Sequence, residues 1–135
     1  MATTTYSHPS AIAKPIVDLP DGDVLTNDMS GFTFKISGGA NTVTLPEPKS
    51  GFQAKFLVTA ATTGTISIQT PSGNRDTLEG SLIVAGAAVT VDAADEINFI
   101  SGGNVGDFVE IFSDGTNYYV FGVALAAGKI TATEI

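Results

Sequence analysis

The chain has 135 residues, no cysteine and a formal net charge of -8, from 14 acidic and 6 basic side chains. This length fits one domain with its own core, and the absence of cysteine excludes disulfides, thiolate metal sites and cysteine nucleophiles. The acidic balance disfavours nucleic acid and anionic membranes as partners, because both carry negative charge. Only 15% of the residues are charged and 15 are glycine, a composition that favours strands and turns over helices.

Residues 1–30 differ from the rest of the chain. They carry Pro9, Pro15 and Pro20, which prevent a continuous helix, and they lack the apolar run of a signal peptide. We expect an extended N-terminal arm over this segment and synthesis in the cytoplasm, with a leader of no fixed structure as the alternative. The apolar residues with which the arm would dock are Ile12, Ile16, Val17 and Leu19.

From Phe32 onward, apolar and polar residues alternate with the period of a half-buried strand. Such runs recur about every ten residues, which is typical of a sandwich or barrel. We therefore predict an all-β domain over residues 31–135, an antiparallel β-sandwich or barrel (jelly-roll-like), with about nine short strands and helices of one turn at most. The expected strands cover residues 32–36, 42–45, 53–59, 65–69, 78–84, 87–91, 96–100 and both arms of a hairpin over 108–123, with a short final strand within 127–135.

The hairpin, "FVEIFSDGTNYYVFGV", carries apolar side chains on both faces. Asp114-Gly115 predicts a two-residue type I′ loop, because both central residues of that turn need positive φ. This loop would place Ile111 opposite Tyr118. One face then holds Phe108, Glu110, Phe112, Asn117, Tyr119 and Phe121, and the other holds Val109, Ile111, Tyr118 and Val120.

Two explanations account for the second apolar face of the hairpin. Either the arm or a loop covers it within a closed sandwich or barrel, or another subunit covers it, since aromatic residues are enriched at interfaces. We expect the subunit interface, formed by Val109, Ile111, Tyr118 and Val120.

Combinations of residues suited to catalysis are nearly absent. The single histidine, His8, lies in the arm, so a Ser-His-Asp triad would depend on it alone. The acidic run at 18–28 resembles a calcium loop but lacks the Gly and Glu of the EF-hand pattern, and no carboxylate pair stands out in the second acidic group at 92–96. The glycine-rich stretch at 101–107 precedes no helix, unlike a phosphate-binding loop. We expect no enzymatic activity, no metal and no cofactor.

Two stretches resemble small virion proteins of tailed bacteriophages. They are "TVTLPEPKSGFQAKFLVTAATTGTISIQTPSGN" at 42–74 and "VGDFVEIFSDGTNYYVFGV" at 105–123. The shared features are a proline-ended strand, a strand pair rich in threonine and glycine, and the late hairpin, and the resemblance spans residues 32–125. Several such proteins are capsid decoration (cement) proteins, and related sequences occur in tail and fibre proteins.

The resemblance implies a non-enzymatic decoration protein that binds the outer surface of the assembled shell and stabilises it. Its partners would be the major capsid protein and copies of itself, in a homotrimer, and its location would be the outer capsid surface of the virion. The arm would contact the capsid or a neighbouring subunit, so deleting residues 1–25 should abolish particle binding and leave the domain folded. The alternative is a tail- or fibre-associated β-module that binds a receptor or carbohydrate.

Overall fold

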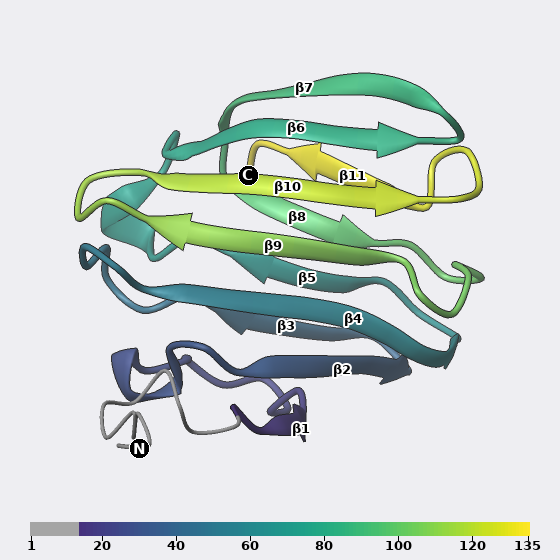
Figure 1. Cartoon of the computed structure of the whole chain (residues 1–135), viewed down its shortest axis with the longest axis horizontal. Coiled ribbons are helices and arrows are strands. Elements are labelled where there is room, and N and C mark those ends of the chain that lie inside the picture. The colour runs from purple at the N-terminus through teal and green to yellow at the C-terminus, as the bar shows by residue number, and fades with distance from the viewer. Residues whose placement is uncertain (1–13) are drawn as a thin grey trace, which may run out of the picture.

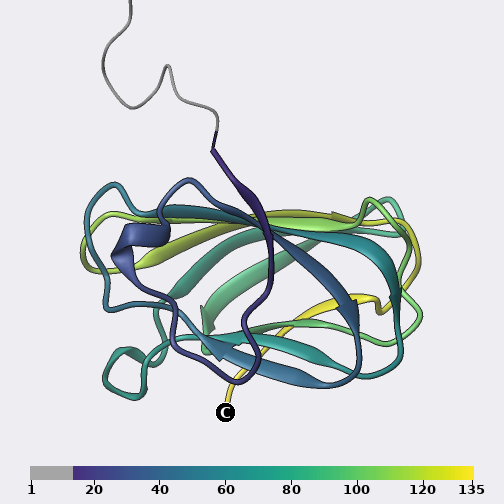
Figure 2. The same ribbon diagram turned by 90° about the horizontal axis from the view of Figure 1, so that it is seen from below.

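The computed structural model describes residues 14–135, which form a two-layered β-sandwich. Figure 2 shows the layers edge-on, a sheet of seven strands packed on a sheet of four. The predicted all-β sandwich is confirmed, and the helices of the described residues are single 3-10 turns, as expected. The elements are β1 (Ile16–Asp18), η2 (Asn27–Met29), β2 (Thr33–Gly38), β3 (Asn41–Thr44), β4 (Gln53–Thr62), β5 (Ile66–Gln69), η3 (Ser72–Asn74), β6 (Leu78–Val84), β7 (Ala87–Ala94), β8 (Glu96–Phe99), β9 (Phe108–Ser113), β10 (Tyr118–Ala124) and β11 (Ile130–Thr133).

The strand order is β1-β2-β4-β9-β10-β6-β7 in the larger sheet and β11-β8-β5-β3 in the smaller one (Figure 1). Both sheets are mixed rather than purely antiparallel, because β1/β2, β2/β4, β3/β5 and β10/β6 pair in parallel. The chain alternates between the layers from β2 to β5. After β2, the chain crosses to the smaller sheet, runs back along β3 and crosses again to the larger sheet. β4 therefore runs in the same direction as β2, and by the same path β5 runs in the same direction as β3.

The inner faces of the two sheets form one apolar core. Phe34 on β2 and Phe56 on β4 stack there with ring centroids 5.4 Å apart, and Tyr118 donates its hydroxyl to the carbonyl of Pro46. Burial raises the pKa of the Tyr118 phenol, and the charge of Glu47 raises it further. Phe34, Phe56 and Tyr118 are buried members of strands along which buried and more exposed residues alternate.

The described part of the predicted arm belongs to the sandwich. β1 extends the larger sheet beside β2, and the N–H of Leu19 donates to the carbonyl of Lys35 at 3.3 Å. Leu25 is buried in the core, and its N–H donates to the carbonyl of Thr44 at 2.8 Å. The β-domain thus begins before the predicted boundary at residue 30, because the apolar residues between the prolines complete the sheet edge and the core.

Candidate functional site

The β9–β10 hairpin closes with a four-residue loop instead of the predicted two-residue loop. Oδ1 of Asp114 accepts the N–H groups of Thr116 and Asn117, both at 2.8 Å, and these bonds stabilise the longer loop. The N–H of Asn117, and then that of Thr116, hold the pKa of Asp114 below its ordinary value. Tyr118 therefore pairs with Ser113. The register shifts by two residues, so every side chain keeps its predicted face.

The predicted interface residues lie in the core of the sandwich. Val109, Ile111, Tyr118 and Val120 are at most 4% exposed and belong to the apolar cluster between the sheets. The prediction of a subunit interface through these four residues is wrong, because the protein's own smaller sheet covers them. A signal for this was present in the sequence, since this face of the hairpin carries no charged or amide side chain.

The opposite face of the hairpin is open and carries aromatic side chains. Phe112, Tyr119 and Phe121 are 40%, 41% and 43% exposed, and Phe108 is half-buried beside them. These four residues are called the aromatic face. Glu110 and Asn117 share this side of the hairpin, and their polarity is the signal that could have assigned it to the exterior.

Pairing between the strands brings the aromatic face together. Tyr119 lies opposite Phe112, and the rings of Phe108 and Phe121 meet edge-on with centroids 6.2 Å apart, a favourable geometry for aromatic pairs. The Tyr119 hydroxyl donates to the carboxylate of Asp114 at 2.9 Å, which orients this ring. The rings are therefore positioned by a rigid sheet and by the loop that joins its strands.

Aliphatic side chains continue the aromatic face across the sheet. Phe108 lies between Leu57 on β4 and Val123 on β10, and Val123 in turn lies opposite Ile83 on β6. These three aliphatic side chains are half-buried. An apolar strip thus crosses four neighbouring strands on the outer side of the larger sheet.

A shallow pocket of about 270 Å³ adjoins the aromatic face at Phe112. On its wall, Nζ of Lys55 lies 3.8 Å from Oε1 of Glu110 and 4.7 Å from the ring centroid of Phe108. The cation is attracted by both the carboxylate and the ring. Polar groups therefore stand beside the rings, within reach of a ligand that covers them. The pocket wall also includes Lys14, Thr33 and Gln53.

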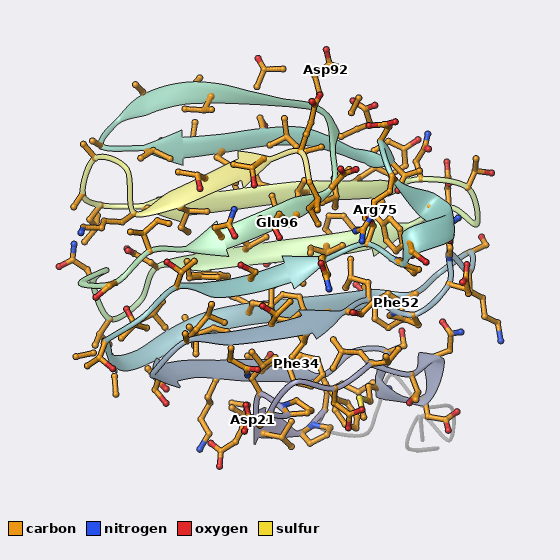
Figure 3. The ribbon with its side chains drawn as sticks, turned by 180° about the vertical axis from the view of Figure 1, so that it is seen from behind. Asp21, Phe34, Phe52, Arg75, Asp92 and Glu96 are labelled. Carbon is orange, nitrogen blue, oxygen red and sulfur yellow. The ribbon has the colours of Figure 1, made fainter. Side chains whose placement is uncertain are left out.

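The outer face of the smaller sheet is polar, in contrast to the aromatic face. Figure 3 looks onto this side, with Glu96 on β8. Oγ of Ser67 donates to Oδ1 of Asn98 at 2.5 Å, and Nδ2 of Asn98 donates to Oγ1 of Thr133 at 2.9 Å. Thr133 donates in turn to Oε1 of Glu96 at 3.0 Å. These side chains satisfy one another's hydrogen bonds, and the buried Asn98 bonds to both Ser67 and Thr133, so this polar face needs no apolar cover.

The acidic groups noted in the sequence serve the fold or face solvent. Asp95 is buried and accepts the N–H groups of Ile135 and Asp76, both at 2.7 Å. The bond from Ile135 and then that from Asp76 lower the pKa of Asp95 against the opposing effect of burial, and the charge of Arg75 assists. Among residues 14–135, no group of three or more His, Cys, Asp or Glu side chains is arranged to hold a metal ion. Over the same range, no helix is long and apolar enough to cross a membrane.

The candidate contact residues of the arm fall in three places. Ile12, like His8, lies outside the described residues. Ile16 is exposed on β1, whereas Val17 and Leu19 pack against the core. Of the three described residues, Ile16 is the one that is open to a partner, and the other two hold β1 on the sandwich.

Comparisons of the chain with protein-family models, with curated proteins and with solved structures give no match. The candidate site is therefore defined by geometry alone. It comprises the aromatic face, its aliphatic continuation across the larger sheet and the adjoining polar pocket.

Proposed function

We propose that the protein is a non-enzymatic capsid decoration protein of a tailed phage, which binds the outer surface of the assembled shell and stabilises it. Exposed apolar surface on a rigid sheet typically marks a contact with another protein, and the aromatic face is the observation that carries this proposal. The resemblance of residues 32–125 to phage virion proteins supports it. We assign the aromatic face to the contact with the major capsid protein.

The contact is weak for one copy and strong for a whole particle. Phe112, Tyr119 and Phe121 each keep about two-fifths of their surface exposed, so burying the remainder contributes about 1 kcal/mol per ring. Such a contact is modest alone, but a protein that binds only the assembled shell stabilises that state by mass action. Contacts repeated over the shell surface add to this effect.

A binding assay with shells tests the proposal. Empty shells of the phage that encodes the chain, prepared without it, would be mixed with wild-type protein, with Phe121→Ser and with Thr42→Ala, a control on the exposed polar sheet. Sedimentation and cryo-electron microscopy would give the occupancy. We expect wild type and control to saturate the shells and Phe121→Ser to bind about five-fold more weakly. Absence of the wild-type chain from shells and from purified virions would overturn the proposal.

Because residues 14–30 belong partly to the sheet and core, a shorter deletion is needed to test the arm. Deleting residues 1–25 would remove β1 and Leu25, and with them part of the sheet and core. Deleting residues 1–13 leaves every described element in place. We propose that residues 1–13 together with Ile16 form a second contact to the shell or a neighbouring copy, so this shorter deletion should lower occupancy without unfolding the domain.

A tail- or fibre-associated module that binds a receptor carbohydrate is the second candidate. The exposed rings of Phe112 and Tyr119 favour it, because aromatic rings stack on the apolar C–H faces of sugars. Gln53, Lys55 and Glu110 line the adjoining pocket and offer hydrogen bonds that would orient such a ligand. Glycan-array hits that are lost in Phe112→Ala and kept by the polar-sheet control, without binding to shells, would favour this function over decoration.

A further inference from the structure

The eight-residue strand β7 forms an open edge of the larger sheet (Figure 1). An edge strand presents unpaired N–H and C=O groups that can pair with another strand. The other sheet edges are shorter: β1 has three residues, β3 and β11 have four each, and a bridge between Val24 and Thr44 covers part of β3. Among the described elements, β7 is the long edge that remains open.

Over residues 87–91, β7 lacks the features that normally protect an edge, because its charged residue, Asp92, and its register irregularity opposite Leu78 and Gly80 come after them. Residues 87–91, "AAVTV", contain no charge and no proline, whereas natural edges are usually blocked by one of these. Within the described chain, no backbone hydrogen bond joins these residues to a strand other than β6. Val89 pairs with the core residue Leu82 and so points to the inner side of the sheet, yet it is 41% exposed. The edge therefore leaves both backbone groups and an apolar side chain without cover.

We propose that β7 pairs antiparallel with β7 of a second copy, about a two-fold axis that passes midway between the two Val89 residues. This register sets Val89 opposite Val89, so that each covers the other, and sets Ala88 opposite Thr90. A two-fold axis joins identical surfaces and closes after two copies. The small side chains along the strand allow the two backbones to approach to hydrogen-bonding distance.

The uncharged edge is a part of this acidic chain at which a second copy can approach without charge repulsion. A chain of net charge -8 repels itself wherever acidic groups meet. In the proposed register, Asp92 of one copy lies opposite Gly86 of the other, so the acidic groups at the two ends of the interface stay apart. The uncharged edge also offers no feature by which a basic or acidic partner would recognise it, whereas it is complementary to itself.

The pairing would place both aromatic faces on one side of a continuous sheet. Directly opposed residues of an antiparallel pair point to the same face of the sheet. Because Val89 points inward in both copies, both smaller sheets lie on one side and both aromatic faces lie on the other. The inference does not rest on the proposed function, but it would double the surface that any partner of the aromatic face can contact.

Introduced cysteines test the contact directly, because the chain contains no other thiol. Val89→Cys is compared with Val105→Cys, a more exposed valine in the loop before β9. We expect mild oxidation to convert Val89→Cys to a covalent dimer at least about ten-fold faster than the control, because the contact raises the effective concentration of the thiols. Equal rates for the two variants would overturn the proposal.

Mixed cysteine variants test the register. An equimolar mixture of Ala88→Cys and Thr90→Cys should form mainly the mixed disulfide, whereas each variant alone should crosslink slowly. A mixture of Val89→Cys with Thr4→Cys tests whether the edge instead receives the N-terminal segment of another copy. Preferential formation of that mixed disulfide would overturn pairing between two β7 strands.

Solution mass provides an independent test without cysteines. Light scattering should give the mass of two chains for the wild type and for Val105→Lys, and the mass of one chain for Val89→Lys, in which the two lysines would repel each other. Circular dichroism checks that both variants are folded. A wild-type mass of one chain, or the three-chain mass implied by the resemblance to decoration proteins, would contradict the two-fold contact.

Discussion

Replacing Asp95 by Asn removes a carboxylate charge to which two backbone N–H groups donate hydrogen bonds. The carboxylate accepts N–H groups from Ile135 and Asp76, both at 2.7 Å. A hydrogen bond to a charged group contributes about 1.5–3 kcal/mol, and the lower end applies here because both donor residues are exposed. The Asn side chain accepts one of these N–H groups in a neutral hydrogen bond worth about 1 kcal/mol. Its NH₂ group then faces the other N–H, which loses its acceptor. The expected loss of unfolding free energy is therefore about 2 kcal/mol at pH 7.

The pH dependence of this loss follows from the lowered pKa of Asp95. A carboxyl group whose pKa is lower in the folded state contributes stability above its unfolded pKa, which is about 3.9. That contribution disappears as the pH falls through the folded pKa. The difference between wild type and Asp95→Asn should therefore be complete at pH 7 and shrink below about pH 4.

Urea and thermal unfolding followed by circular dichroism measure both quantities. For a chain of this length, a loss of about 2 kcal/mol lowers the melting temperature by about 8 °C. Asp92→Asn is the matched control, because Asp92 is exposed in the same acidic stretch (Figure 3), and it should change stability by less than about 0.5 kcal/mol. Equal stability of Asp95→Asn and wild type at pH 7, or a penalty that persists unchanged at pH 3, would refute this account of the bond.

Three further substitutions test how the sandwich is held together. Tyr118→Phe leaves a buried carbonyl without its donor and should lower the urea-derived unfolding free energy by about 1–2 kcal/mol, whereas a loss as small as that of Tyr119→Phe would contradict the role of this hydroxyl. Gly80→Ala should yield little folded protein on expression, because the φ of Gly80 is 145° and a Cβ there would lie 2.0 Å from a carbonyl oxygen of β10. In the control Gly73→Ala, the added Cβ meets no atom within 4 Å, so this variant should fold. Equal yields of the two variants would refute the clash. Leu25→Ala should cost about 2–5 kcal/mol as a buried leucine of the core, and an unchanged urea midpoint would place residues before 31 outside the folding unit.

The hairpin shows how far a local pattern leads. Alternation along "FVEIFS" and "YYVFGVA" separates the side chains into two sets, and both sets keep their membership in the structure. A register error of two residues did not disturb this separation, because the side-chain period of a strand is two. The assignment of the sets to inside and outside was reversed, because large apolar side chains occur in both sets and outnumber Glu110 and Asn117 in the outer one.

The sequence by itself determined the class of the fold and the position of most strands, because period-two alternation and turn residues act over a few neighbours. It missed β1, whose three residues lie between prolines and are too few to show a period. It could not determine the parallel pairings, because these depend on the path of the chain between the layers.

Only the tertiary structure decided which apolar face is covered. Val109, Ile111, Tyr118 and Val120 are buried because the four strands of the smaller sheet, drawn from separate parts of the chain, pack over them. The aromatic face is open because the smaller sheet covers only the other side of the larger sheet. The edge of β7 is open because no strand of the smaller sheet pairs with it. Burial is a property of the whole packed assembly of strands. Glu110 and Asn117 could indicate the outer face of the hairpin from the sequence, but the extent of the open apolar surface across four strands emerged only with both layers in place.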